Sequence, residues 1–150
     1  MTKLLENQVI IQIGLVVENI EKTSDYYSKI FGIEKPDWFW TESYESAKTM
    51  YKDKPTQAIA KLMFFKFGQV ELELIEPDEK PSTWREHLDK YGEGVHHIAF
   101  VVDNIEQKVK KLNEIGIPLS QKGEFEGGRY AYIDTFKELK VLLELLELKS

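Results

Sequence analysis

The sequence predicts an α+β fold in which two tandem βαβββ modules form a curved mixed sheet around a shared cleft. Two internal matches carry this prediction. The run from Ile13 to Glu21 pairs with the run from Ile98 to Glu106 at an offset of 85 residues, and the run 70–76 pairs with 141–147 at an offset of 71. Matches at the start and at the end of two stretches indicate halves that are built alike.

Each predicted half begins with a strand and continues with a helix. Runs rich in β-branched residues predict strands at 9–17 and 95–102. Asn19 and Asn104 follow these strands and are typical helix N-caps. In the second helix, apolar residues recur at steps of four and three and therefore share one face. These residues are Ile105, Val109, Leu112 and Ile115.

The two helices are expected to end at Gly32 and Gly116, where a left-handed residue commonly closes a helix. Further extended segments are predicted at 57–66, 69–76, 129–134 and 140–147. Neither half is large enough to bury a sufficient core and fold stably alone, so we expect one domain over residues 1–150. Its parts are module 1 at about 9–76, a connector at 77–94 with a short helix near 83–90, and module 2 at about 95–147.

The composition limits the function classes. A net charge of -6 without a basic run argues against nucleic acid as a partner. The chain has no cysteine, which excludes disulfides, thiolate metal sites and cysteine nucleophiles. No apolar run approaches the length of a membrane span, and the first residues lack the apolar core of a signal peptide, so we expect a cytoplasmic protein without a membrane partner.

Four polar side chains occupy equivalent strand positions in the two halves. The repeat maps Gln12 onto His97 and Glu73 onto Glu144. If a pseudo-two-fold axis relates the halves, these side chains converge near that axis, and an imidazole, an amide oxygen and two carboxylates suit a divalent cation. Alternatively, each glutamate taken alone would lie on the solvent-exposed face of a half-buried strand, and His97 would be a hydrogen-bonded structural histidine.

The strand openings and the duplicated plan resemble the vicinal oxygen chelate superfamily, also called the glyoxalase/bleomycin-resistance/dioxygenase family, from Val9 to Glu147. The segments GEGVHHIAFVVDNI, LIEP (74–77) and VLLELLE (141–147) are most similar to methylmalonyl-CoA epimerases. This resemblance implies a divalent metal ion (Co, Zn, Ni, Mn or Mg) held by Gln12, Glu73, His97 and Glu144. Glutamine stands where the family usually has its first histidine.

The resemblance also implies a chemistry, the removal of a proton beside the thioester carbonyl of an acyl-CoA, with the metal stabilising the enolate oxygen. Epimerisation needs a base on each face of the reacting carbon. Glu144 is expected to be one base as well as a metal ligand. The second base of the family lies on a middle strand of the first half, where the expected register places Lys61. The alternative for Lys61 is a solvated strand residue. We also expect a homodimer.

Other functions remain open. A lactoylglutathione lyase of the glyoxalase I type would share the ligand set, but Val16 and Pro77 stand where those enzymes carry the arginine and asparagine that bind glutathione. Gln12 argues against an extradiol dioxygenase, which usually has two histidines. A non-catalytic member of the superfamily would instead sequester a small molecule in a metal-free cleft.

Three further features have alternative interpretations. Strand alternation directs His96 to the side opposite His97, where it is expected to be structural, and His87 is expected at the surface of the connector helix. The aromatic run 38–40 either lines an acyl pocket or buries area in the core or against a second subunit. The glycines of 126–129 fit a hairpin turn or a phosphate contact.

Overall fold

The computed structural model describes residues 3–149. The elements of the first half are β1 (Gln12–Val16), α1 (Ile20–Phe31), β2 (Phe39–Trp40), α2 (Tyr44–Ala47), β3 (Met50–Tyr51), β4 (Lys54–Pro55), β5 (Ala60–Phe67) and β6 (Val70–Pro77). Helix α3 (Thr83–Tyr91) connects the halves. The second half contains β7 (Gly94–Val101), α4 (Ile105–Glu114), β8 (Leu119–Phe125), β9 (Gly128–Ile133), α5 (Phe136–Leu139) and β10 (Leu142–Leu148).

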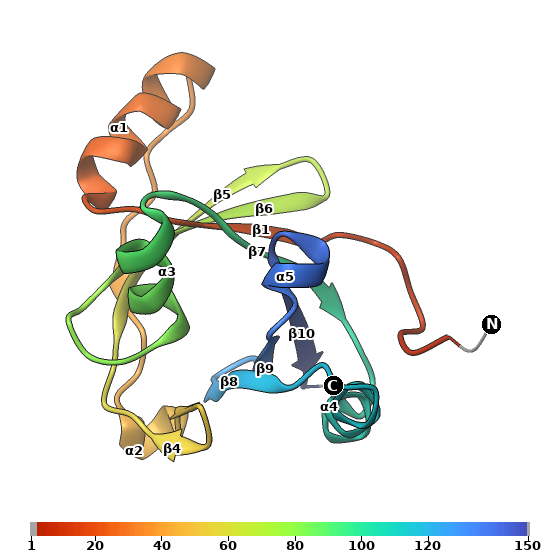
Figure 1. Ribbon diagram of the computed structural model, residues 1–150. Helices are drawn as coiled ribbons and strands as arrows, with labels where there is room; N and C mark the ends of the chain where they lie inside the picture. Colours follow the sequence, from red (N-terminus) through yellow and green to blue (C-terminus); the bar gives the residue numbers. More distant parts are fainter. Residues whose placement is uncertain (1–2, 150) are drawn as a thin grey trace.

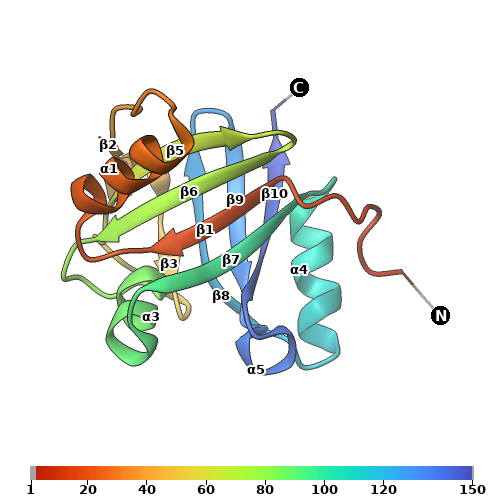
Figure 2. The same cartoon turned by 90° about the horizontal axis from the view of Figure 1, so that it is seen from above.

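The strands of residues 3–149 form one 10-stranded mixed sheet in the order β2-β5-β6-β1-β7-β10-β9-β8-β3-β4. The sheet curls into a half-barrel, as Figures 1 and 2 show, which confirms the predicted α+β fold class with a curved mixed sheet. At its centre β1 runs antiparallel to β7, while β1 is parallel to β6 and β7 is parallel to β10. The pattern of strand directions in β6-β1-β7-β10 is therefore the same from either end of this set, as the sequence repeat predicts.

The helix ends follow the sequence signals. The side chain of Asn19 accepts a hydrogen bond from the backbone N–H of Lys22, and Asn104 does the same for Gln107. Gly32 ends α1 in the left-handed conformation, with φ of 62°. The connector helix α3 also forms as expected, at Thr83–Tyr91.

Some strands were not predicted. Strand β8 contains Gly123 and several polar residues, so it lacks the β-branched run of a typical strand. The hairpin of β3 and β4 belongs to the first half of the chain but pairs with β8 of the second. This exchange extends the sheet of module 2 with a segment of module 1.

The core has three clusters, two on the outer face of the sheet and one on its concave face. Val17, Met63 and Phe65 pack with Ile20 of α1 on the outer face of module 1. Ile133 and Leu145 pack with α4 on the outer face of module 2. The concave face carries the third cluster, in which Trp84 of α3 packs with residues of both modules. Gln12, Glu73, His97 and Glu144 lie on this concave face.

Within residues 3–149, no helix has the length and apolar character needed to cross a membrane.

Candidate metal site

Each of the four central strands contributes one of the four predicted side chains to the concave face. Along β1, Gln12, Gly14 and Val16 point to this face, because alternate residues of a strand share a side. The parallel pairing of β1 with β6 sets Glu73 opposite Gly14. The pairings of β7 set His97 opposite Gly14 and Glu144 opposite Ala99. The structure therefore brings together the four side chains that the repeat predicted would converge.

The four side chains meet at the Nε2 atom of His97. This nitrogen lies 2.9 Å from Gln12 Oε1, 3.2 Å from Glu73 Oε1 and 3.1 Å from Glu144 Oε1. All four residues are buried, with exposed fractions of 8% for Gln12, 6% for Glu73, 0% for His97 and 4% for Glu144. Three oxygens from three strands are thus gathered around one imidazole nitrogen away from water.

One N–H group cannot satisfy three oxygens. The hydrogen bond of His97 Nε2 goes to Gln12 Oε1, whereas Oε1 of Glu73 and Oε1 of Glu144 are buried without a hydrogen-bond partner among residues 3–149. Buried polar atoms without partners are rare in folded proteins and commonly mark the place of an ion or a water molecule. Two unsatisfied carboxylate oxygens beside an amide oxygen and an imidazole nitrogen are the donor set that a hard-to-borderline divalent cation prefers.

The spacing of the donor atoms agrees with a shared cation. Ligand atoms about 2.1 Å from a metal ion and at right angles to each other are about 3.0 Å apart, and the three oxygens lie 2.9–3.2 Å from His97 Nε2. The amide of Gln12 supplies the third oxygen of this set. Within residues 3–149, His, Cys, Asp and Glu side chains alone form no group of three that is arranged to hold a metal ion.

Burial and the neighbouring charges shift the ionisation of the site. Burial by itself lowers the pKa of His97, but the carboxylates of Glu144 and Glu73 outweigh it and raise this pKa to about 10. Burial also raises the pKa of Glu73, and the proximity of His97 opposes that shift. Without a metal ion, His97 is therefore the cation that the two carboxylates attract.

Gly14 makes room for the His97 ring and was not predicted as a site residue. A Cβ atom on Gly14 would lie 2.0 Å from Cε1 and 2.4 Å from Nδ1 of His97, so only glycine allows the ring to cross the backbone of β1. A glycine inside a β-branched strand commonly marks such a close approach. That signal was present in the run QIGLVV (12–17).

A β-bulge corrects the predicted orientation of His96. The pairing of β1 with β7 matches Gly14 with His97 and Leu15 with Val95, so His96 is an extra residue without a partner. A bulge interrupts alternation and can turn two successive side chains to the same side. His96 accordingly faces the concave side with His97, and their Nδ1 atoms are 2.8 Å apart.

Lys61 does not reach the site, which corrects its predicted position. The pairing of β5 with β6 sets Phe64 opposite Glu73 and Lys61 opposite Glu76, so Lys61 lies on the other face of the sheet. There its ammonium group is 3.4 Å from a carboxylate oxygen of Glu76 and 4.5 Å from the centre of the Trp38 ring. The residues of β5 that do share the face of Glu73 include Leu62 and Phe64, and neither carries a base.

Aromatic and aliphatic side chains surround the four donors. The ring of Tyr132 lies 5.1 Å from that of His97, and the indole N–H of Trp84 donates to the hydroxyl of Tyr132 at 3.1 Å. Trp84 thereby fixes α3 across one end of the concave face. His87, on the same helix, is only 7% exposed and contacts the rings of His96 and Phe136, so the prediction of a surface histidine was wrong.

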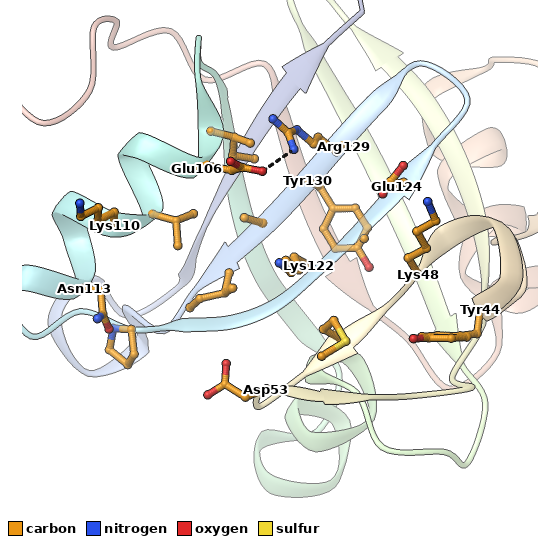
Figure 3. A pocket seen from close by; sticks show the side chains of 17 residues that line it. Tyr44, Lys48, Asp53, Glu106, Lys110, Asn113, Lys122, Glu124, Arg129 and Tyr130 are labelled. Carbon is orange, nitrogen blue, oxygen red and sulfur yellow. Dashed lines mark hydrogen bonds and ion pairs between the residues drawn. The ribbon is translucent and has the colours of Figure 1, made fainter.

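A separate hollow lies on the outer face of module 2, between α4 and the α2–β3 segment (Figure 3). Its volume is about 700 Å³. Ala131 lines this hollow and also packs against α4, so the hollow lies on the face of the sheet opposite the four donors. Cationic and anionic side chains both surround it, among them Lys48, Lys122 and Glu124. This mixture does not favour a ligand of either charge.

Comparison with known proteins agrees with the fold. Protein YqjC of Bacillus subtilis (strain 168), described as uncharacterized, is 29% identical over 141 residues, which cover 92% of this chain and 91% of that protein. The crystal structure of the hypothetical protein BH1468 from Bacillus halodurans C-125 matches with a TM-score of 0.67 and 24% identity, over 95% of both chains. Methylmalonyl-CoA epimerase from Mycobacterium tuberculosis matches with a TM-score of 0.63 and 19% identity, over 100% of this chain and 93% of that one.

A family model covers most of the chain. It matches residues 11–132, which include Gln12, Glu73 and His97. The chain therefore belongs to the Glyoxalase/Bleomycin resistance protein/Dioxygenase superfamily.

Proposed function

We propose that this protein is a divalent-metal-dependent isomerase that removes a proton beside the thioester carbonyl of an acyl-CoA, as methylmalonyl-CoA epimerases do. One observation carries the proposal, namely the two buried and unsatisfied carboxylate oxygens of Glu73 and Glu144 beside His97. The fold supports it, because structures of methylmalonyl-CoA epimerase, one of them in complex with methylmalonyl-CoA, share the architecture.

In this proposal the metal is held by Gln12 Oε1, Glu73 Oε1, His97 Nε2 and Glu144 Oε1, the atoms that meet in the site. When bound, it supplies Lewis-acid stabilisation of the negative charge that forms on the substrate carbonyl oxygen. Four protein donors leave open positions for that oxygen or for water if the metal is six-coordinate. The imidazole and the amide are neutral ligands, so the two carboxylates balance the charge of a divalent ion.

We assign the proton transfer to Glu144. Its carboxylate is 4% exposed and lies opposite Tyr132 on the neighbouring strand, so water has little access to it. A carboxylate held in a dry site beside the developing charge is well placed to accept a proton and to return it. Because Lys61 lies on the other face of the sheet, this chain needs a different source for any second proton transfer.

The stereochemical course tests the proposal. In D₂O with added Co(II), we expect methylmalonyl-CoA to exchange its α-proton for deuterium, and metal-free protein to lose this exchange. Proton exchange followed by mass spectrometry, with (R)/(S) interconversion followed in parallel, separates one-base from two-base chemistry. Exchange without interconversion would show that Glu144 acts alone on one face of the carbon, and would contradict the proposed isomerase activity. Absence of exchange with Co, Zn, Ni, Mn and Mg would remove the enzymatic proposal.

A second candidate function is the binding of a small molecule without catalysis. The observation in its favour is the apolar character of the side chains beside the donors, because Leu62 and Phe64 occupy the face where Lys61 was expected. Elemental analysis after purification without chelators distinguishes the two functions, since the binding protein needs no stoichiometric metal. Activity on the methylglyoxal–glutathione adduct would instead indicate a lactoylglutathione lyase of the glyoxalase I type.

We also propose that the protein forms a homodimer through the outer face of α1. Tyr26, Ile30 and Phe31 are 57%, 72% and 55% exposed, and they lie close together on this helix. Contiguous exposed apolar side chains commonly mark an interface. Light scattering after size-exclusion chromatography gives the mass directly, and Ile30→Glu is expected to convert the dimer to a monomer. A wild-type monomer would contradict this assignment.

A further inference from the structure

A chain of buried hydrogen-bonding contacts runs from His97 away from the four donors. Nδ1 of His97 is 2.8 Å from Nδ1 of His96, and Nε2 of His96 is 3.2 Å from Oγ1 of Thr83. His96 and His97 are 0% exposed and Thr83 is 3% exposed. Water therefore does not compete for these contacts. Nε2 of His97 faces the three oxygens of the site, while its Nδ1 contacts His96, and Nε2 of His96 contacts Thr83.

The chain has one direction when His97 binds a cation. A neutral imidazole that uses Nε2 as a ligand carries its proton on Nδ1. At 2.8 Å that proton is donated to Nδ1 of His96, which must then be unprotonated and act as the acceptor. His96 accordingly carries its own proton on Nε2 and donates it to Oγ1 of Thr83.

We propose that His96 is a positioning residue, which accepts the Nδ1–H of His97 and thereby holds Nε2 of His97 toward Gln12, Glu73 and Glu144. The inference rests on the proposed metal site. Histidine ligands generally donate their second N–H to a fixed acceptor, which sets the tautomer and the ring orientation. Here the acceptor is the preceding residue in sequence, and the bulge at His96 brings its ring to the same side.

Beyond Thr83 the contacts continue into the second module. The backbone N–H of Thr83 donates to Oε1 of Gln121 at 2.9 Å, which leaves the amide nitrogen of Gln121 to donate to the hydroxyl of Tyr130, also at 2.9 Å. Gln121 is 0% exposed. Because Thr83 is the first residue of α3, the orientation of His97 is coupled to the helix that carries Trp84 across the concave face.

Zn(II) affinity tests the inference without reference to activity. His96→Leu removes the acceptor, and His96→Asn keeps a carbonyl oxygen near the place of Nδ1. His87→Leu is the matched control, since His87 is a buried histidine that contacts His96 without a place in the chain. In competition with a chelator, we expect His96→Leu to weaken Zn(II) binding about 10- to 100-fold. His96→Asn and His87→Leu are expected to stay within about threefold of wild type.

Two results of the Zn(II) competition would overturn the inference. One is His96→Leu binding Zn(II) as tightly as wild type, and the other is His96→Asn losing as much affinity as His96→Leu. If His96→Leu fails to fold, ¹⁵N NMR of the histidine rings in Zn(II)-loaded wild type decides. The expected tautomers are Nδ1–H for His97 and Nε2–H for His96, and Nδ1–H on His96 would refute the proposal. Wild-type protein that binds Zn(II) but exchanges no substrate proton would refute only the proposed isomerase activity.

Discussion

The imidazole of His97 crosses the backbone of Gly14 on the neighbouring strand so closely that a Cβ atom there would lie 2.0 Å from Cε1 of the ring. Glu73 and His97 flank Gly14 on either side, since β1 pairs with both β6 and β7 at this point. Gly14 thus provides the space in which Nε2 of His97 meets oxygens from three strands.

Gly14→Ala is therefore expected to displace His97. The added methyl group collides with the ring, and overpacking of this kind costs about 1–3 kcal/mol of unfolding free energy. We expect Zn(II) binding to weaken at least about tenfold, because the ring leaves the common centre of the donors. Gly127→Ala is the control, since its Cβ would meet only the side chain of Phe125, at 3.1 Å. Unchanged Zn(II) affinity in Gly14→Ala would show that His97 is not a ligand in this orientation.

Metal binding is expected to release a proton from His97. In the metal-free protein the pKa of His97 is raised from 6.5 to about 10, against the effect of its burial, by Glu144 and Glu73. Because only the neutral ring binds a metal, each metal ion displaces the Nε2 proton between these two pH values. Potentiometric titration with Zn(II) near pH 8 should show at least about one proton released per metal through this exchange. Metal uptake without proton release would contradict the assignment.

The same shift predicts a pH dependence of the metal-free fold. A basic group with a raised folded-state pKa contributes stability that is fully present below its unfolded value, here 6.5, and is lost as the pH rises through about 10. As the pH rises from 8 to 10, the urea midpoint of the metal-free protein should therefore decrease, and it should decrease more than that of the Zn(II)-loaded protein. Equal slopes for the two forms would indicate that His97 is already neutral in the metal-free state.

The convergence of the four donors was predictable because strand alternation and the repeat both constrain it. Gln12 and His97 are related by the repeat, as are Glu73 and Glu144, and equivalent positions of paired modules meet at the axis between them. The structure brings these side chains together, and their role as metal ligands stays a prediction. Hydrophobic pattern and cap residues likewise predicted the helices that begin after Asn19 and Asn104.

Features that depend on register were not predictable from the sequence. A shift of one residue moves a side chain to the other face of a sheet, and the register of β5 against β6 places Lys61 away from the site. The bulge at His96 has the same origin, because pairing between distant strands decides where an extra residue is inserted. The burial of His87 depends on how α3 packs against the sheet, which the polar connector sequence does not reveal.

Gln12→His is expected to strengthen metal binding. Gln12 supplies an amide oxygen at the position where the family usually has a histidine, and an imidazole is the better ligand for Zn(II) and Co(II). We expect affinity for these ions to rise about tenfold, and affinity for Mg(II), which prefers oxygen, to fall. Isothermal titration calorimetry with the three ions measures both changes. A uniform loss of affinity would indicate that the site cannot accommodate a second imidazole beside His97.

Lys61→Met is expected to leave metal binding and proton exchange unchanged. Its ion pair with Glu76 is about one-quarter exposed on either side, and together with the contact to Trp38 it contributes about 1 kcal/mol or less to stability. A small decrease in the urea midpoint with unaltered exchange kinetics is the predicted outcome. A large decrease in exchange would mean that Lys61 contacts the substrate in a state that differs from this structure.

Glu144→Gln and Glu73→Gln separate the base from a carboxylate that only binds metal. Both side chains are buried, and each presents one unpartnered oxygen beside His97, so each substitution removes one negative charge from nearly the same environment. We expect Zn(II) and Co(II) affinity to fall by about 10- to 100-fold in either variant. At saturating Co(II), Glu73→Gln should retain measurable proton exchange, whereas Glu144→Gln should lose about 100-fold or more because its amide cannot accept the proton. Exchange that survives in Glu144→Gln and vanishes in Glu73→Gln would move the base to Glu73, and exchange that survives in both would place the base outside the four donors.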